Sequence, residues 1–203
     1  MTTNALHFFH EIRSPLRKRL LAYFFSNPQA RLYLREIALK LEVDAANLSR
    51  ELKRLEKEGI FLSKKNGLQK YFSLNKNYPL YRELKSMIFK TLGVQGAIQS
   101  LLNGMPGIQR AFLYGSFAKE TEGAHSDIDV CLVIQRQKFD EESLLLKLHK
   151  LENNLGREIN YTFFTVEEWE DKKKSDDNFI TQLLQGKRID LIHEKVGKDK
   201  EDI

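Results

Sequence analysis

This chain of 203 residues contains one cysteine, four prolines and no hydrophobic run of the length that a membrane-spanning helix needs, roughly 18 residues. A single cysteine, Cys131, can form no disulfide within the chain and cannot build a cysteine-ligated zinc site, which favours a reducing compartment. The first residues show no basic start followed by a long apolar stretch, so we expect no signal peptide, no membrane association and a cytoplasmic protein.

Hydrophobic residues make up 41% of the chain and charged residues 30%, which predicts a folded protein with one medium core or two small ones. The net charge of +5 is unevenly distributed. Residues 1–93 carry 18 basic and 8 acidic side chains, a net charge of +10, whereas residues 94–203 have a net charge of −5. This division favours two domains, one that binds a polyanion and one that is acidic or binds metal.

The first half of the chain has the pattern of three helices followed by a hairpin. Ser14-Pro15 predicts a capped helix that ends at Asn27-Pro28, and a second, short helix is expected over residues 34–41. Asp44 is expected to cap a third helix that runs to about Glu58.

The third helix and the hairpin both expose basic residues. Leucines recur in the helix at helical spacing, which predicts that they face the core and leave a polar, basic face open. Two strand-like runs over residues 60–65 and 68–74 are joined by Asn66-Gly67, a strong hairpin signal, with three lysines clustered at the tip. The leucines of the core face are Leu48, Leu52 and Leu55.

This order of elements over roughly residues 14–77 resembles the winged helix-turn-helix domains of ArsR- and MarR-like regulators. The resemblance implies that the third helix enters the major groove of double-stranded DNA and that the wing contacts backbone phosphates. A protein-docking module with merely solvated basic residues is the alternative that stays open. The expected DNA contacts are Asn47, Ser49, Arg50, Lys53 and Arg54 on the helix and Lys64, Lys65 and Lys70 on the wing.

A helical pattern over residues 78–91 follows the hairpin and suits either a homodimer contact or a packing helix between domains. Residues 92–96, with two glycines, mark the expected border between the domains. The predicted organisation is a DNA-binding domain over 1–77, a connecting helix over 78–95, a second domain over 96–195 and a charged tail over 196–203.

The pattern with the most chemical content begins with a strand-like run over residues 108–114 that leads into Gly115-Ser116. Glycine allows close backbone approach, and a hydroxyl and free N–H groups at a helix start can hold phosphate oxygens. Ten residues later, a second strand-like run begins with Ser126-Asp127-Ile128-Asp129. Carboxylates two residues apart on a strand point to one side and can share a divalent cation. Cys131 is expected to face away from them as a small core residue.

The form Gly-Ser-x-Ala followed by Ser-Asp-x-Asp resembles the minimal nucleotidyltransferases of the DNA polymerase beta-like superfamily, over about residues 96–193. The resemblance implies a small mixed sheet with helices on one side. It also implies that Gly115 and Ser116 hold a nucleoside triphosphate, with ATP as the expected nucleotide, and that Asp127 and Asp129 hold Mg²⁺ or Mn²⁺. Two further nucleotide contacts are expected, Lys119 as a cation near phosphate and Ser126 as a hydroxyl that could equally form a turn.

Active members of that superfamily carry a third carboxylate on the following strand, which is expected here over residues 157–164. Asn160 stands where aspartate is expected, and an amide cannot act as a base near neutral pH. Glu158 lies on the same face two residues earlier, so it reaches the site if the strand register differs by one pair. Catalysis and nucleotide binding without turnover therefore both stay open.

The sequence as a whole predicts an α+β protein with an N-terminal winged helix-turn-helix and a nucleotidyltransferase-fold mixed β-sheet with flanking helices. Two functions follow. The first is a DNA-binding transcription regulator that senses a nucleotide. The second is an enzyme that transfers a nucleoside monophosphate to a protein or small-molecule hydroxyl. Minimal nucleotidyltransferases act as antitoxins of HEPN-type toxins, so the resemblance also implies a toxin as an acceptor.

Overall fold

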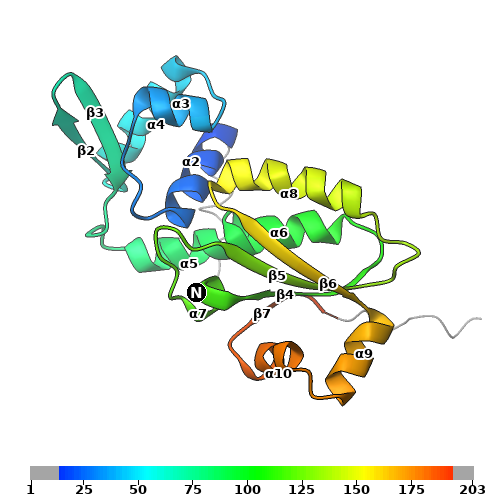
Figure 1. Cartoon of the computed structure of the whole chain (residues 1–203). Helices are drawn as coiled ribbons and strands as arrows, with labels where there is room; N and C mark the ends of the chain where they lie inside the picture. The colour runs from blue at the N-terminus through cyan, green and yellow to red at the C-terminus, as the bar shows by residue number, and fades with distance from the viewer. Residues whose placement is uncertain (1–13, 194–203) are drawn as a thin grey trace, which may run out of the picture. The chain divides into compact units, whose positions relative to one another are not determined.

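The computed structural model describes residues 14–193, which form two compact units (Figure 1). Within the described residues, one unit comprises 14–97 and 150–156, and the other 98–149 and 157–193. The N-terminal residues considered for a signal peptide and the expected tail over 196–203 lie outside the described residues. Within 14–193, no helix combines the length and apolar character that crossing a membrane requires.

The first unit begins with three helices, and the first and third start after the expected capping residues. The Ser14 hydroxyl accepts a hydrogen bond from the Arg17 N–H at 3.3 Å, and the Asp44 carboxylate accepts one from the Asn47 N–H at 2.8 Å. Each side chain thereby satisfies an N–H group that has no partner within its helix. The helices are α2 (Pro15–Ser26), α3 (Leu34–Lys40) and α4 (Ala45–Lys57).

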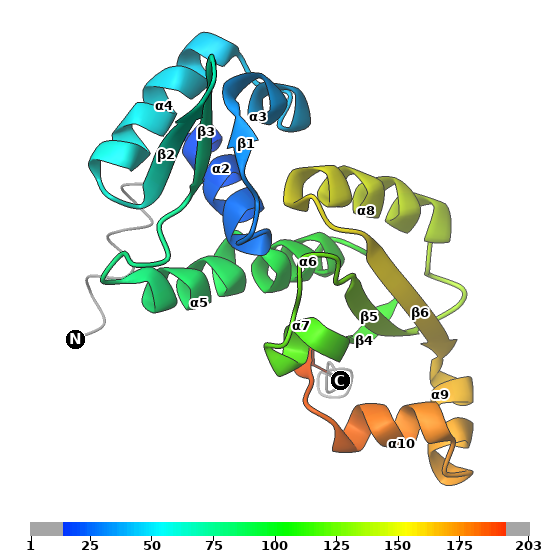
Figure 2. The same ribbon diagram turned by 60° about the vertical axis from the view of Figure 1, so that its left-hand side comes forward.

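A three-stranded antiparallel sheet completes the winged-helix arrangement and lies beside these helices (Figure 2). Its hairpin turn is displaced by one residue from the expected position, because Asn66 pairs with Gln69 and leaves Gly67-Leu68 as the loop. Gly67 has a φ of +59°, which a glycine adopts readily at the first position of a two-residue hairpin loop. The strands are β1 (Leu32–Tyr33), β2 (Phe61–Asn66) and β3 (Gln69–Leu74), in the order β1-β3-β2.

The core of this unit confirms the predicted inner face of the third helix, since Leu48, Leu52 and Leu55 are fully buried. Glu51 lies on the same side of α4 and is also buried. Its carboxylate pairs with the Arg17 guanidinium of α2 at 3.3 Å. This ion pair ties the first helix to the third.

Two further helices follow the wing, α5 (Tyr81–Thr91) and α6 (Val94–Asn103). Leu92 and Gly93, in the segment expected to hold the domain border, separate these two helices, and Gly96 lies inside α6. A Cβ at Gly96 would overlap the carbonyl oxygen of Thr91. The glycines therefore allow two helices to follow each other closely and do not mark a flexible segment.

The second unit is built on a four-stranded sheet in the order β6-β5-β4-β7. β5 pairs with β6 in parallel and with β4 antiparallel, so the sheet is mixed as predicted. β7, which the sequence analysis did not identify, pairs with the other side of β4. The strands are β4 (Ile108–Tyr114), β5 (Ile128–Ile134), β6 (Ile159–Thr165) and β7 (Ile189–Ile192).

Helices cover both faces of this sheet, which corrects the expectation of helices on one side. The parts of α6 and of α8 (Glu141–Leu155) that belong to this unit lie on one face. On the other face lie α9 (Val166–Lys174) and α10 (Asn178–Gln185) (Figures 1 and 2). The physical reason is visible in β5, where every residue from Val130 to Ile134 is buried, so neither face can be left in water.

Candidate functional site

The two aspartates lie where β5 begins, Asp127 just before the strand and Asp129 as its second residue. The sheet register pairs Asp129 with Asn160 on β6 and with Tyr114 at the end of β4. The Asn160 amide Nδ2 lies 3.4 Å from Asp127 Oδ2, to which it donates a hydrogen bond. Two carboxylates and one amide therefore meet at this end of the sheet.

The register also decides between Asn160 and Glu158. The Ile128 N–H donates to the Glu158 carbonyl at 2.9 Å, and the first register pair is Ile128 with Ile159. Glu158 therefore comes just before this pair and lies beside Asp127. It is Asn160 that lies opposite Asp129. The register of β6 therefore does not place Glu158 opposite Asp129.

The electrostatics of the pair favour a bound cation. Partial burial raises the pKa of Asp129 above its ordinary value; a hydrogen bond from Asn160 opposes this shift, and the charge of Asp127 adds to it. Burial, followed by the charge of Asp129, raises the pKa of Tyr114 as well. Negative charge at this point is thus unfavourable without a counter-charge, which a divalent cation would supply.

The expected phosphate turn lies directly against Asp129. Gly115 begins the five-residue helix α7 (Gly115–Lys119) with a φ of +70°. A Cβ at this position would overlap Oδ2 of Asp129 and lie 3.1 Å from its Cγ. Glycine is required here both by the backbone angle and by the neighbouring carboxylate. Ser116, the next residue, is half-buried in the first turn of α7.

The other two expected nucleotide contacts differ in their surroundings. Lys119 is the last residue of α7 and is exposed. The Ser126 hydroxyl accepts a hydrogen bond from the Gly123 N–H at 2.8 Å and so closes the loop that precedes Asp127. In this structure Ser126 serves the turn, the second of the two roles that the sequence left open.

Cys131 is buried as expected, but the face assigned to it was wrong. Residues two apart on a strand point to the same side, so Cys131 shares a face with Asp129 and packs with Phe112 and Trp169 beneath α9 and α10. Burial raises the pKa of the Cys131 thiol to about 12. The thiol therefore stays protonated and behaves as a core group.

Arg157 is a site residue that sequence reasoning missed. Its Nη1 donates to the carbonyl oxygens of Ala124 at 2.8 Å and Ser126 at 2.9 Å, in the loop that leads to Asp127. Its guanidinium also lies 5.6 Å from the ring centre of Phe117 on α7. Its partners are backbone atoms more than 30 residues earlier in the chain, so no local motif could have revealed it.

The donor set at the sheet end fits a hard divalent cation. Among residues 14–193, no group of three or more His, Cys, Asp or Glu side chains is placed to hold a metal ion. The candidate ligands are the carboxylates of Asp127 and Asp129 and, after rotation of its amide, the Asn160 carbonyl oxygen. Oxygen ligands of this kind, with substrate phosphates completing the shell, are those that Mg²⁺ prefers.

The open face of α4 carries the residues expected to contact DNA. Asn47, Arg50, Lys53 and Arg54 are exposed and Ser49 is half-buried. The Arg50 side chain donates to the Asn47 side chain on the same face.

The three wing lysines do not form one cluster. Lys65 is the cross-strand partner of Lys70, whereas Lys64 stands opposite Tyr71 and points to the other side of the hairpin. Lys70 is bound at 2.8 Å by the Glu56 carboxylate of α4, whose pKa is lowered by hydrogen bonds from Lys70 and Ser63. Lys64 and Lys65 are exposed.

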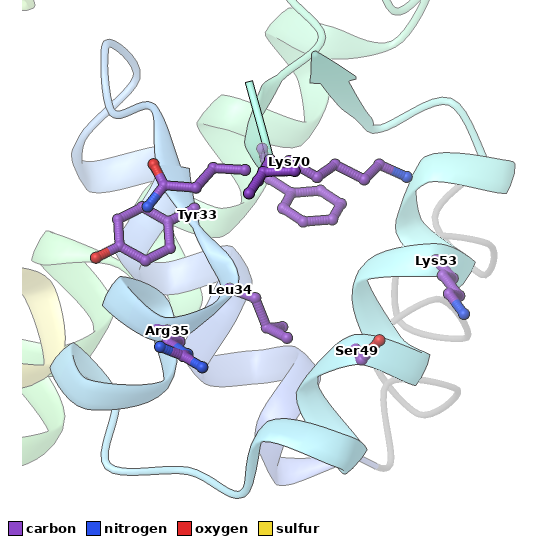
Figure 3. Close-up of a pocket in the computed structure, with 9 residues that line it drawn as sticks. Tyr33, Leu34, Arg35, Ser49, Lys53 and Lys70 are labelled. Atoms are coloured by element: carbon purple, nitrogen blue, oxygen red, sulfur yellow. The ribbon is translucent and has the colours of Figure 1, made fainter. Parts of the chain in front are cut away.

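A cavity of about 590 Å³ lies between the wing, α3 and α4, within the first unit (Figure 3). All of its charged lining residues are cations, namely Arg35, Lys53 and Lys70. Ser49 and Gln69 add polar groups, so the surface between helix and wing is suited to an anion. Arg35 had not been singled out from the sequence, because it stands on the second helix and outside the expected interface.

The comparison with protein families agrees with the second part of this architecture. The family model described as "Polymerase beta, Nucleotidyltransferase" matches residues 97–193. This part of the chain is a nucleotidyltransferase domain, and the fold joins it to an N-terminal winged helix-turn-helix, as predicted. No curated protein matches the chain.

Several solved structures are similar at low identity. A toxin-antitoxin crystal structure with AMP-PNP shares 20% identity, with a TM-score of 0.36, over 50% of this chain and 74% of its own. A mutant of S. aureus MepR bound to an oligodeoxyribonucleotide shares 18% identity, with a TM-score of 0.35, over 50% of this chain and 73% of its own. AdcR from Streptococcus pyogenes shares 16% identity, with a TM-score of 0.36, over 73% of this chain and 84% of its own. Similarities at this level define neither substrate nor partner.

Proposed function

We propose that the protein is a DNA-binding regulator whose nucleotidyltransferase domain binds a nucleoside triphosphate together with Mg²⁺. The observation that carries the nucleotide half is the contact between Gly115 and Asp129, because it sets a turn suited to phosphate directly beside a pair of carboxylates. The DNA half is supported by the exposed polar face of α4 and by the cation-lined cavity beside it.

Each residue has a distinct role in this proposal. The backbone N–H of Ser116 and its hydroxyl would bind phosphate oxygens, and Lys119 would offset their charge. Asp127 and Asp129 would hold the cation, which supplies charge neutralisation at the triphosphate. Asn160 would complete the ligand set through its carbonyl oxygen.

The position of Asn160 favours binding over turnover. It occupies the place opposite Asp129 where a third carboxylate would bind a second metal or accept a proton from an attacking hydroxyl. An amide is a neutral ligand for a metal and cannot accept that proton near neutral pH. Loss of such a group costs about two to four powers of ten in rate, whereas one-cation nucleotide binding does not depend on it.

The second candidate function is transfer of a nucleoside monophosphate to a hydroxyl group, with a toxin protein as one acceptor. In this reaction the hydroxyl oxygen attacks the α-phosphorus, pyrophosphate leaves and a base takes the hydroxyl proton. The observation in its favour is Glu158, an exposed carboxylate two residues before Asn160 and beside Asp127.

Calorimetry of the full chain with Mg²⁺ and a non-hydrolysable ATP analogue tests nucleotide binding. We expect the Asp127→Ala/Asp129→Ala variant to lose at least about tenfold in affinity, since two cation ligands disappear. Asp171→Asn, an exposed acid on α9, is the matched control and keeps wild-type affinity. Equal affinity in the wild type and the double variant would refute the assigned site.

Labelled ATP with Mg²⁺ and cell lysate distinguishes the two functions. Label transfer by the wild type supports the enzyme. Transfer only by Asn160→Asp supports a binding site that has lost its catalytic carboxylate. Nucleotide binding without label transfer by the wild type or by Asn160→Asp supports the regulator.

A further inference from the structure

The loop between α7 and β5 has to be held in place for the candidate site to exist. Residues 120–127 have no helix or strand of their own, yet they end in Asp127 and begin directly after the Gly115–Lys119 turn. A loop carrying a metal ligand needs anchoring from outside its own sequence, because free backbone rotation would move the carboxylate by several ångströms.

Arg157, which lies just before β6, supplies such an anchor. Its side chain is buried, with 6% relative exposure, and one guanidinium nitrogen donates to both the Ala124 and the Ser126 carbonyls. The second carbonyl belongs to the residue immediately before Asp127. A buried cation that donates to fixed carbonyl oxygens holds them more strongly than a neutral donor would.

The same guanidinium also reaches the phosphate side of the site. Its Cζ lies over the ring of Phe117, 5.6 Å from the ring centre, and Phe117 directly follows Ser116 and is buried in α7. Arg157 itself stands two residues before the first residue of β6 and three before Asn160. One side chain therefore contacts the turn and the loop while its own backbone leads into the strand that carries Asn160.

We propose that Arg157 is the positioning residue of this site: it sets the separation between the Asp127 carboxylate and the Gly115-Ser116 turn. This inference rests on the proposed function for the ligand that the separation serves. Arginine suits the role because its planar group can donate to two carbonyls and stack on a ring at once. Lysine keeps the positive charge, but its ammonium group is not planar and is more compact than a guanidinium group.

The test compares Arg157→Lys and Arg157→Gln with Arg136→Lys in the full chain. Arg136 also lies over an aromatic ring, Phe163 at 5.7 Å, but follows the opposite end of β5. The first measurement is hydrogen exchange of the peptide covering residues 120–127, with the peptide covering β4 as a check that the unit is folded. The second is the affinity for Mg²⁺ with the ATP analogue, measured well below the unfolding temperature of each variant.

We expect both Arg157 variants to speed exchange in residues 120–127 and to weaken analogue binding by about tenfold or more, with β4 unchanged. Arg136→Lys should change neither measurement. Unchanged exchange in the loop overturns the inference, and so does faster exchange with unaltered affinity, since the role would then be structural only. If the wild type binds no analogue, the proposed function fails, and loop exchange alone then decides whether Arg157 holds Asp127 in place.

Discussion

Gly115 combines a positive φ of +70° with a carboxylate packed over its Cα. Replacement by alanine should cost about 1–2 kcal/mol from the backbone angle alone. Overlap with Asp129 adds to this and moves the carboxylate, so we expect a total loss above about 2 kcal/mol and impaired cation binding. Denaturant unfolding and calorimetry measure the two effects.

Two other glycines separate these contributions. Gly67→Ala has a similar backbone angle, with a φ of +59°, but nothing within 4 Å of the new Cβ, so it reports the backbone cost alone. Gly123→Ala has an ordinary φ and its nearest neighbour at 3.8 Å, so it should be almost neutral. If Gly115→Ala costs no more than Gly67→Ala, the carboxylate does not lie against the turn.

The raised pKa of Asp129 predicts a stability effect with a definite sign. Burial raises its pKa above 3.8, so its contribution to stability is fully present below that pH and is lost as pH rises through the folded-state pKa. At pH 7 without metal, Asp129→Asn should therefore raise the Tm, and the gain should vanish toward the acid end of the folded range. Thermal unfolding in a chelator across pH measures this.

A bound cation should reverse the difference in Tm between the wild type and Asp129→Asn. Adding Mg²⁺ should raise the Tm of the wild type and leave that of Asp129→Asn nearly unchanged, because only the wild type keeps both carboxylates. Asp171→Asn should follow the wild type throughout. A lower Tm for Asp129→Asn at pH 7 in the chelator would contradict the conclusion that burial makes the negative charge of Asp129 unfavourable.

At the residue scale, local spacing predicted most of the candidate site. The Gly115-Ser116 motif spans two residues and the Asp127-Ile128-Asp129 motif three, so both can be recognised locally. Strand alternation alone predicts that both carboxylates lie on one face. Arg157 was not predictable, because what matters is its contact with carbonyls 31 and 33 residues away. The choice between Glu158 and Asn160 also needed the register, which only the paired strands define.

At the element scale, helices with caps were predicted well and short strands were not. Ser14 and Asp44 act within three residues of themselves, so their signals are local. β1 has two residues and β7 has four, and both exist through pairing with strands distant in the sequence. The close approach of Gly96 to Thr91 was not predictable, because it depends on how two successive helices pack.

The wing predicts a graded salt dependence of DNA binding. Replacing Lys64 or Lys65 by alanine should reduce the slope of log affinity against log salt by about one phosphate contact each, because both are exposed. Lys70→Ala should reduce the slope less and lower stability more, since Glu56 already binds Lys70. Titrations of a random-sequence duplex at several salt concentrations measure the slopes.

The three lysine variants serve as one another's controls. Equal slopes for all three would show that the Glu56 ion pair does not persist in solution. A wild-type affinity without salt dependence would contradict DNA binding altogether and favour the docking module that the sequence left open.

At the scale of the whole molecule, the regulator and the enzyme differ in whether two ligands influence each other. Residues 1–93 have a net charge of +10 and residues 94–203 one of −5, so the two proposed ligands, both anionic, are assigned to parts of opposite charge. A regulator requires the binding of one to alter the binding of the other. An enzyme merely anchored to DNA does not.

Coupling of this kind is reciprocal by thermodynamic necessity. If Mg²⁺ with the ATP analogue changes duplex affinity by about fivefold or more, the duplex must change analogue affinity by the same factor. We expect such a factor for the wild type, measured by titrating each ligand at saturating and zero concentration of the other. The Asp127→Ala/Asp129→Ala variant should bind duplex normally without analogue and show a factor near one. A factor near one in the wild type, with both ligands bound, would reject nucleotide sensing, because a ligand that binds two states equally cannot shift the balance between them.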